Sequence, residues 1–316
     1  MSIAFLFPGQ GSQKPGLLHS LPNHPVVVRC LMEAATVLEQ DALLLDTTEA
    51  LRSTYAIQVS LLIAGVASMR ALRDLGATPA LVAGHSVGAF AAAVAAGSLA
   101  FDDALRLVAL RAKAMAAAST EGYGMAAIIG LTEAEVQRLL ARWDRTAPGL
   151  YLAVINAPRQ VVVSGRRDHL AMFMRLASTS GAQKTTLLAI PVPAHCVLME
   201  EASTALRDAF ASVAIRDADV TYVRNRDARP TVSAAAIRDD LIGGPESPVR
   251  WHDSMEILVE LGANLVVELP PGCVLSDLAR ASFQNLRSVA MAEQSLHAVA
   301  DMVKGMRSGP SEWRRI

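Results

Sequence analysis

Apolar positions along the chain alternate between short runs and helical periodicity, in the order typical of α/β proteins. Residues 3–7 form a short apolar run that predicts a buried strand, and residues 81–84 form another. Residues 26–38 and 56–75 carry the 3.6-residue period of helices, and Gly76 ends the second of them. The pattern therefore predicts a mixed α/β fold from the first strand onward.

The pattern changes after residue 123 to the order β-α-β-β-α-β, which is the ferredoxin-like arrangement. The expected elements are strands at 125–130, 152–156, 160–164 and 184–190, and helices at 132–141 and 168–180. Thr132 and Glu135 match a capping box at the start of the first helix. We predict a small domain, residues 124–188, inserted into a large domain formed by residues 1–123 and 189–316.

The remaining chain adds weaker signals. The expected elements are helices at 102–118, with Asp102 as the cap, at 196–210 and at 251–261, and strands at 220–223 and 265–269. A turn at 270–272 leads into residues 274–279. Residues 242–248 are rich in turn formers, and the polar tail after Met306 is expected to be loosely held.

Residues 84–88 read Gly-His-Ser-Val-Gly and match the G-x-S-x-G pattern of a nucleophile elbow. An expected strand precedes them and an alanine-rich helical stretch follows, which is the context that this motif requires. Gly84 and Gly88 suit a turn so tight that a Cβ at either position would clash with backbone. Ser86 would then expose its hydroxyl at the apex, close to the positive end of the helix. The alternative interpretation is a glycine-bounded turn whose serine caps a helix.

His195 is the favoured base among the seven histidines. Pro191 and Pro193 hold the preceding segment extended, and His195 follows Ser86 in the sequence, as the base of α/β-hydrolases does. His85 lies next to Ser86, but adjacent side chains at a turn point apart. Since no acidic partner stands out between Ser86 and His195, no third catalytic residue is assigned.

Composition narrows the function classes. The 316 residues are 52% hydrophobic and 19% charged, with a net charge of −1, which fits a compact protein and gives no indication of nucleic-acid or membrane binding. The three cysteines lie far apart in the sequence and form no metal-binding spacing, which suits a reducing cytoplasm. The apolar run at 3–7 ends at once in Pro-Gly, and residues 87–101 are too few to span a bilayer. We therefore expect a cytoplasmic protein without a metal site.

Other polar residues are ambiguous by themselves. The glycine-rich loop at 8–13 lacks the pattern of a phosphate-binding loop, and one Gly-x-Gly is too little for a dinucleotide site. Gln58, taken alone, is expected to face solvent. Arg106, Arg111 and Lys113, which lie on one expected helix, are typical of a solvated face.

Several segments, taken together and in this order, resemble the malonyl-CoA:acyl-carrier-protein transacylase family. They are Phe7-Pro8-Gly9-Gln10-Gly11-Ser12-Gln13, Gly84-His85-Ser86-Val87-Gly88, Arg111, Asn156, Pro193-Ala194-His195-Cys196 and Leu269-Pro270-Pro271-Gly272. The resemblance covers nearly the whole chain. Many family members have Glu at the position of Ala89 and Gly at that of Pro270. In these two positions, in Phe90 and in the short N-terminal helical region, the sequence is most similar to the epsilon subunit of malonate decarboxylase.

The resemblance implies an α/β-hydrolase-like core with a parallel sheet, carrying the small ferredoxin-like domain. It implies Ser86 as the nucleophile and His195 as its base, oriented by a backbone carbonyl of the 247–250 loop. The backbone N–H groups of Gln10 and Val87 match the oxyanion hole of the family. The implied reaction is a ping-pong transfer of malonyl from coenzyme A to a carrier-protein thiol through malonyl-O-Ser86.

The same resemblance implies the substrate contacts. Arg111 matches the arginine that pairs with the free malonyl carboxylate, and Gln58 and Asn156 match positions that line the same pocket. No cofactor is expected, because malonyl-CoA is a substrate and the carrier protein bears the thiol prosthetic group. The expected partners are malonyl-CoA, the acyl carrier protein and other malonate decarboxylase subunits. Candidate carrier-docking residues are basic, because carrier proteins tend to be acidic: Arg166, Arg167, Lys184, Arg224 and Arg226.

Three alternatives stay open at this point. The same transacylase could serve fatty-acid or polyketide synthesis. A general serine esterase shares the elbow and the fold, but it would need an acid between Ser86 and His195 and no arginine clamp. A non-catalytic subunit that binds a carrier protein is the alternative from outside the enzymes.

Overall fold

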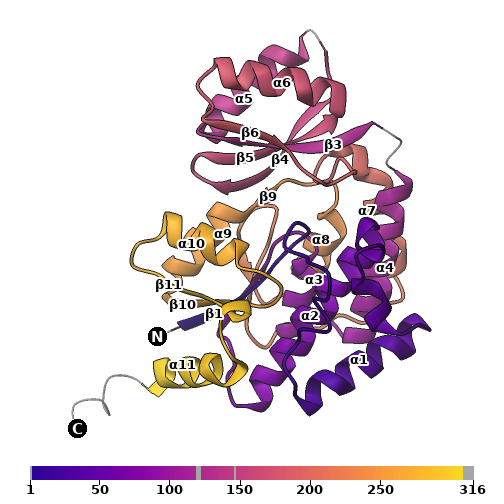
Figure 1. Cartoon of the computed structure of the whole chain (residues 1–316), viewed down its shortest axis with the longest axis vertical. Coiled ribbons are helices and arrows are strands. Elements are labelled where there is room, and N and C mark those ends of the chain that lie inside the picture. Colours follow the sequence, from indigo (N-terminus) through magenta and orange to yellow (C-terminus); the bar gives the residue numbers. More distant parts are fainter. Residues whose placement is uncertain (1, 119–121, 146, 309–316) are drawn as a thin grey trace.

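The computed structural model describes residues 2–118, 122–145 and 147–308, and its core is a mostly parallel sheet covered by helices (Figure 1). The strand order is β11-β10-β1-β2-β7-β8, and only β7 and β8 pair antiparallel. The strands are β1 (Ser2–Phe7), β2 (Leu81–Gly84), β7 (Thr221–Val223), β8 (Pro230–Thr231), β10 (Ala263–Glu268) and β11 (Arg287–Ala290). Strands β1 and β2 read as continuous apolar runs because helices cover both faces of a parallel sheet.

Helices surround this sheet. Their bounds are α1 (Pro25–Leu38), α2 (Thr54–Asp74), α3 (Gly88–Ala95), α4 (Phe101–Ala117), α7 (Glu200–Phe210), α8 (Ala234–Gly243), α9 (Trp251–Glu260), α10 (Val274–Ser282) and α11 (Leu296–Ser308). Helix α2 is long and apolar enough to cross a membrane by length and composition, but 89% of its most apolar window is buried inside the protein. It packs against α1, α3 and α4, as the central helix of a protein core does.

A second, smaller sheet lies at one end of the molecule (Figure 1). Its strand order is β6-β3-β5-β4-β9, from β3 (Tyr123–Ile129), β4 (Leu150–Ala157), β5 (Gln160–Arg166), β6 (Lys184–Leu187) and β9 (Val249–Arg250). Helices α5 (Glu133–Asp144) and α6 (Arg167–Thr179) complete the β-α-β-β-α-β order that the sequence predicted. Thr132 and Glu135 form the predicted capping box of α5.

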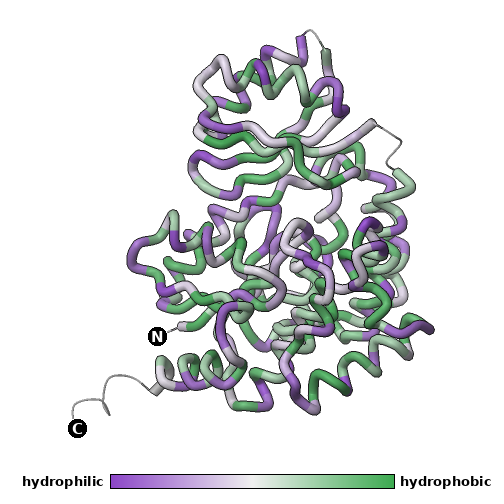
Figure 2. The backbone as a smooth tube through the Cα atoms, viewed as in Figure 1, coloured by the Kyte–Doolittle hydropathy of each residue, from purple (hydrophilic) through white to green (hydrophobic). Residues whose placement is uncertain are grey.

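The strands of the small sheet alternate between two packing partners. Ala126 and Ile128 of β3 share an apolar cluster with α5 and α6, whereas Met125 and Ala127 share one with Trp251 of the larger part. Successive side chains of a strand point to opposite faces, so the sheet is buried on both. In Figure 2 hydrophobic positions accordingly run along these strands, between hydrophilic turns. The small sheet is thus fixed against the larger part, although the proposed domain boundaries stay a prediction.

Some expected elements differ from the structure. Asp102 does not cap α4, because the N-cap is Ala100 and Asp102 lies within the first turn. The helix expected at 196–210 begins with a 3-10 turn, Val197–Met199, and becomes α-helical only at Glu200. Helices α8 and α11 and strand β11 had not been predicted. Residues 309–316 of the polar tail lie outside the described residues.

Parallel pairing brings the ends of several strands to one edge. Phe7 pairs with Gly84, Ala83 pairs with Val223, and Leu6 pairs with Glu268. The loops that follow these strands therefore meet at the carboxyl edge of the sheet, where ligands of open α/β sheets bind. The glycine-rich loop and the G-x-S-x-G turn lie side by side there.

Candidate active site

The G-x-S-x-G turn connects β2 directly to α3. A Cβ built on Gly84 would lie 2.1 Å from the carbonyl carbon of Gly88, and one on Gly88 would lie 2.1 Å from the carbonyl oxygen of Phe7. Both positions therefore require glycine, as the sequence predicted. Ser86 has a φ of 56°, a left-handed conformation that is unfavourable for a serine and is typical of a strained functional turn.

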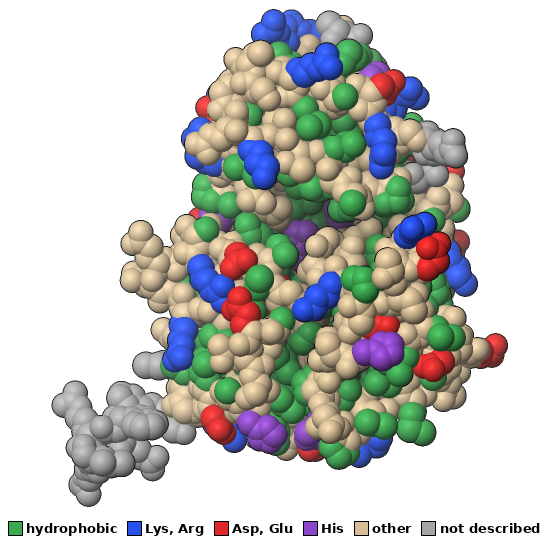
Figure 3. All heavy atoms as spheres, viewed as in Figure 1, with side chains coloured by type: hydrophobic (Ala, Val, Ile, Leu, Met, Phe, Trp, Pro, Cys, Tyr) green, Lys and Arg blue, Asp and Glu red, His purple; other side chains and the backbone are tan. Residues whose placement is uncertain are grey.

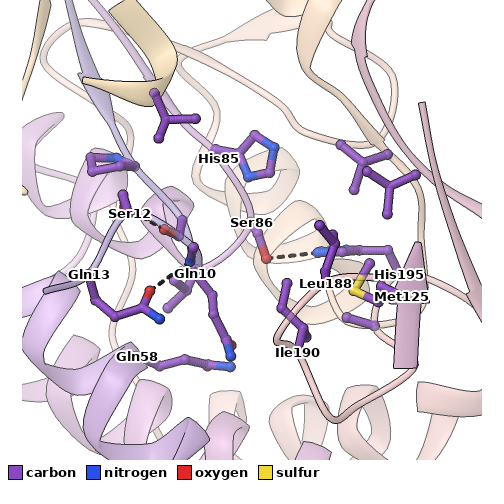
Figure 4. Close-up of a pocket in the computed structure, with 18 of the residues that line it drawn as sticks. Gln10, Ser12, Gln13, Gln58, His85, Ser86, Met125, Leu188, Ile190 and His195 are labelled. Carbon is purple, nitrogen blue, oxygen red and sulfur yellow. Dashed lines mark hydrogen bonds between the residues drawn. The ribbon is translucent and has the colours of Figure 1, made fainter. Parts of the chain in front are cut away.

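Ser86 and His195 meet at this edge although 109 positions separate them. The Ser86 Oγ lies 2.8 Å from His195 Nε2 (Figure 4). The other ring nitrogen, Nδ1, lies 2.9 Å from the carbonyl oxygen of Gly244 and 3.2 Å from that of Ser247. A carbonyl only accepts, so Nδ1 carries the proton and Nε2 is left to accept the serine proton. The resemblance had placed the orienting carbonyl at 247–250; Ser247 fits, but Gly244 makes the shorter contact.

The imidazole of His195 is held neutral. Burial lowers the pKa of His195 to about 3, with further lowering by the positive charge of Arg111 and by the neighbouring His85 ring. Among the described residues no carboxylate bonds to the ring, and backbone carbonyls take the place of an acid at Nδ1. The backbone N–H of His195 donates to the Pro245 carbonyl at 2.7 Å, and its φ of 66° is again left-handed. The loop at 244–247 therefore fixes both the backbone and the ring.

Arg111 lies inside the protein, contrary to the solvated face expected from its helix. Its side chain is 1% exposed, its Nη1 donates to Gln58 Oε1 at 2.6 Å, and its Nη2 donates to Ser86 Oγ at 3.2 Å. No carboxylate within the described parts of the chain pairs with it. Burial lowers the pKa of Arg111 to about 10, so the group stays charged at neutral pH. A buried cation without a counter-ion is costly, which makes it a receptor for an anion.

Gln58 is buried as well, at 1% exposure, so the expectation from its sequence neighbours alone was wrong. It lies on α2 and contacts Arg111 of α4, 53 positions later. Burial of an amide is tolerated where it is hydrogen-bonded, and here the partner is a charged group. No local pattern in the sequence shows this pairing.

The backbone N–H groups of Gln10 and Val87 have no hydrogen-bond partner among the described residues, as is true of several other N–H groups in the loops around the pocket. Both residues line the pocket, and the loop that carries Gln10 packs on the elbow, since a Cβ on Gly9 would lie 2.6 Å from the His85 carbonyl oxygen. The N–H of Ser86, by contrast, donates to Asn225 Oδ1 at 2.9 Å. The Ser86 N–H is therefore occupied, whereas the N–H groups of Gln10 and Val87 are free to donate; their role as an oxyanion hole stays a prediction.

His85 points away from Ser86, as predicted (Figure 4). Its Nε2 lies 3.1 Å from Asn156 Oδ1, and its ring packs 5.5 Å from that of Trp251. Burial lowers the pKa of His85. Asn156 lines the pocket as expected, and it also holds this histidine.

These groups surround a cavity of about 360 Å³ between the two sheets. Figure 3 shows the hollow from outside, with a histidine side chain visible in it. Most of its polar groups come from the larger part, and Asn156 comes from β4 of the small sheet. Apolar side chains cover the rest of the small-sheet side: Met125, Val154, Val162, Leu188 and Ile190. A mostly apolar pocket with a few convergent polar groups is the usual form of a small-molecule site.

A comparison with known families identifies the protein class. The family described as "Acyl transferase domain" matches residues 4–308 of this chain. A malonyl CoA-acyl carrier protein transacylase of Salmonella typhimurium is 36% identical over 306 residues, covering 94% of this chain and 98% of that protein. The chain belongs to the malonyl CoA-acyl carrier protein transacylase family. It is an acyltransferase.

Solved transacylase structures share the fold. The enzyme of Coxiella burnetii superposes with a TM-score of 0.91 at 32% identity, covering 96% of this chain and 97% of that one. A malonyl-transacylase in complex with a type II PKS acyl-carrier protein superposes with a TM-score of 0.90 at 34% identity, covering 95% of this chain and 99% of that one. The parallel sheet and the surrounding helices are thus those of transacylases.

The basic residues suggested for carrier docking in this transacylase differ in their exposure and in whether they already pair with a carboxylate. Arg167 and Lys184 are exposed at the small sheet, and Arg226 is exposed on the larger part. Arg166 is exposed but pairs with Asp168 at 2.8 Å. Arg224 is only 13% exposed and pairs with Asp227, so it is less available for docking than the other four.

Asn225 and Asp240 are the functional candidates of this transacylase that the sequence did not reveal. Asn225 contacts the elbow at the Gly84 carbonyl and the Ser86 N–H, on either side of His85, and Asp240 contacts Asn225. Neither residue belongs to a motif, and 139 positions separate Asn225 from Ser86. Only the pairing of β7 with β2 brings them together.

Proposed function

We propose that the protein transfers the malonyl group from malonyl-CoA to the thiol of an acyl carrier protein, through a malonyl ester on Ser86. One observation carries the proposal. A buried guanidinium without a counter-ion, that of Arg111, lies 3.2 Å from a serine Oγ that is itself 2.8 Å from a neutral imidazole. An acyl group that bears its own carboxylate fits between the cation and the nucleophile.

The first half-reaction forms the ester. His195 Nε2 takes the proton of Ser86 as Oγ attacks the thioester carbonyl, and the imidazolium is stabilised by the Gly244 carbonyl at Nδ1. The Gln10 and Val87 N–H groups donate to the oxyanion, a contribution on the order of 3 kcal/mol per donor. The C–S bond then breaks, and the coenzyme A thiolate takes the proton from His195.

The second half-reaction reverses these roles. The carrier-protein thiol gives its proton to His195 and attacks the ester carbonyl, and the same N–H groups hold the oxyanion. The C–O bond to Ser86 breaks, and Ser86 recovers its proton from His195. The cycle uses no bound cofactor. Water competes with the thiol, so the apolar wall formed by Met125, Leu188 and Ile190 supports transfer over hydrolysis.

Acyl selectivity follows from Arg111. The malonyl carboxylate is one methylene from the reacting carbonyl, and the guanidinium is one hydrogen bond from Ser86. A bidentate guanidinium–carboxylate pair would satisfy the cation. Acetyl-CoA would leave that cation unpaired in a buried site, which costs several kcal/mol, on the order of 3.

The proposal is tested by a transfer assay with malonyl-CoA and a holo acyl carrier protein, read as malonylated carrier by mass spectrometry. Ser86→Ala is expected to abolish transfer, and His195→Ala to lower it by about 10³-fold, the usual contribution of a general base. The double variant is expected to be no worse than Ser86→Ala, because the two groups act as a unit. Transfer at the wild-type rate by Ser86→Ala would refute the proposal.

The other function classes give different results in the same preparation. A general esterase would hydrolyse p-nitrophenyl esters faster than it transfers malonyl, and a non-catalytic carrier-binding subunit would do neither. The contact between Ser86 and His195 supports an enzyme, and the unpaired charge of Arg111 supports a carboxylated acyl group over a neutral ester.

We further propose that this transfer serves a malonate decarboxylase system. The support is the family likeness at Ala89, Phe90 and Pro270; none of the three relatives named above carries that name. Fatty-acid and polyketide synthesis are the alternatives, and a polyketide carrier is the partner in one related structure. Assays with carrier proteins from the three systems separate them, because the proposal requires the highest kcat/KM with the decarboxylase carrier. The cytoplasmic location also stays a prediction.

A further inference from the structure

A buried polar network lies behind the elbow and is not part of the pocket. Asp240 of α8 is 2% exposed. Its carboxylate accepts the Tyr222 hydroxyl at 2.7 Å and the backbone N–H groups of Asn225 at 3.0 Å and Arg226 at 3.3 Å. Asn225 is 6% exposed, and its backbone N–H is held by the Asp240 carboxylate. That carboxylate does not line the pocket.

The side chain of Asn225 forms two hydrogen bonds to the elbow. Its Nδ2 donates to the carbonyl oxygen of Gly84 at 2.8 Å, and its Oδ1 accepts the N–H of Ser86 at 2.9 Å. These two groups flank the peptide unit of His85, immediately before the left-handed Ser86. A side-chain amide that satisfies both stabilises a turn that would otherwise be strained.

Asn225 is also joined to the loop that holds the base. Its carbonyl oxygen accepts the N–H of Arg250 at 2.8 Å. The same α8 that carries Asp240 is followed by Gly244, whose carbonyl oxygen accepts from His195 Nδ1. Helix α8 is thus connected to the nucleophile through Asp240 and Asn225, and to the base through Gly244.

We propose that Asn225 and Asp240 are positioning residues that set the distance and angle between Ser86 and His195. Because Asn225 Oδ1 accepts the Ser86 N–H, that N–H cannot donate to the oxyanion, and the Val87 N–H does so instead. Neither residue touches substrate, since neither lines the pocket. The inference rests on the proposed transfer only for its kinetic readout. The effect belongs in kcat, because the malonyl carboxylate is bound by Arg111 on a different helix.

The variants separate positioning from stability. Asn225→Ala removes both contacts to the elbow, and Asp240→Ala removes the support of Asn225. Asp240→Asn is the conservative variant, because its Oδ1 can still accept the two backbone N–H groups while its amide donates to the Tyr222 oxygen. The matched control is Asp46→Ala. Asp46 is equally buried and accepts the N–H groups of Leu18 and His19, but it is absent from the pocket and the elbow.

The experiment measures kcat and KM for malonyl-CoA, together with the rate at which a fluorophosphonate probe labels Ser86, at a temperature where circular dichroism shows each variant folded. We expect Asn225→Ala and Asp240→Ala to lower kcat and the labelling rate by about 10- to 100-fold, with KM nearly unchanged. Asp240→Asn is expected to restore most of both rates. Asp46→Ala is expected to lower the melting temperature only.

Two results would overturn the inference. One is a loss of kcat and labelling in Asn225→Ala no larger than in Asp46→Ala, which would leave a purely structural role. The other is a rise in KM at constant kcat, which would place the residues in substrate binding. If the wild-type protein labelled with the probe but transferred no malonyl, the proposed function would fail, and the labelling rates would still decide the positioning role.

Discussion

The guanidinium of Arg111 donates a hydrogen bond to the hydroxyl oxygen of Ser86 across 3.2 Å, in a pocket where it has no carboxylate partner among the described residues. Burial first, and the charge of this guanidinium second, lower the pKa of the neighbouring His195 to about 3. The base is therefore neutral in the free enzyme, and the unpaired cation is where the proposed anionic acyl group would bind.

Removal of the cation is expected to change which acyl group is used. Arg111→Ala should lower kcat/KM for malonyl-CoA by about 100-fold or more, because loss of a buried charged partner costs on the order of 3 kcal/mol. The ratio of acetyl to malonyl transfer should rise, since the unpaired charge that rejects acetyl is gone. Steady-state kinetics with both thioesters measure this. Arg106→Ala, an exposed arginine on the same helix, is the control; unchanged malonyl preference in Arg111→Ala would exclude the carboxylate role.

An internal anion is expected to compete with the substrate. Gln58→Glu places a carboxylate where Gln58 Oε1 accepts from Arg111 Nη1 at 2.6 Å, and it changes the side-chain shape very little. The new ion pair should neutralise the cation and raise the KM for malonyl-CoA by about 10- to 100-fold. Measurement of KM in Gln58→Glu and in the neutral Gln58→Leu distinguishes competition from loss of the contact. A lower KM in Gln58→Glu would contradict the prediction.

The kcat/KM of acylation is expected not to change with pH near neutrality. Burial first, and Arg111 second, lower the pKa of His195 from 6.5 to about 3, so the basic form persists in the free enzyme well below pH 6. The profile of kcat/KM should stay flat from pH 8 to about pH 5. A bound malonyl carboxylate offsets the charge of Arg111, so the acid limb of kcat should lie at higher pH. A kcat/KM limb near pH 6.5 would contradict the assignment.

The same shift has a consequence for stability. Because the folded pKa of His195 is lowered, its contribution to folding is fully present above pH 6.5 and is lost as the pH falls toward 3. His195→Gln should therefore lose less stability between these limits than the wild-type protein. Urea unfolding at pH 7 and pH 4 measures the difference, and equal losses in the two proteins would speak against a neutral buried ring.

The elbow is expected to tolerate no side chain at its glycines. Gly88→Ala places a Cβ 2.1 Å from the Phe7 carbonyl oxygen, so the strand or the turn must move. A loss of about 1–3 kcal/mol in the free energy of unfolding follows, with loss of transfer activity. Gly305→Ala is the matched control, since nothing lies within 4 Å of its Cβ and it sits in α11. Alanine should stabilise that helix by about 0.5–1 kcal/mol. Comparable melting temperatures for the two variants would refute the steric argument.

The elbow and the base could be predicted from the sequence for a local reason. The G-x-S-x-G turn needs its two glycines for backbone clearance, and the Pro-x-Pro segment before His195 is visible in the sequence itself. The β-α-β-β-α-β order was equally visible, because strand and helix periods differ. In the larger part, the sequence overstated the capping role of Asp102, since helix α4 had already begun at Phe101.

The charges of the pocket could not be predicted in this way. Gln58 and Arg111 satisfy each other across two helices, so each by itself has the pattern of a solvent-facing residue, and only the family resemblance indicated the pocket. Asn225 and Asp240 left no signal at all, because Asn225 bonds to backbone groups of a turn 139 and 141 positions away and Asp240 bonds chiefly to the backbone beside Asn225. Long-range polar pairing is decided by sheet register, which no local pattern records.

The central claim is that Ser86 carries the malonyl group between its two carriers. The direct test is the intact mass of the protein after brief mixing with malonyl-CoA and no acceptor, followed by peptide mapping. The account predicts an added malonyl group on the peptide that contains Ser86, and its disappearance when a holo acyl carrier protein is added. An unmodified Ser86 peptide, with malonyl nonetheless appearing on the carrier, would contradict it.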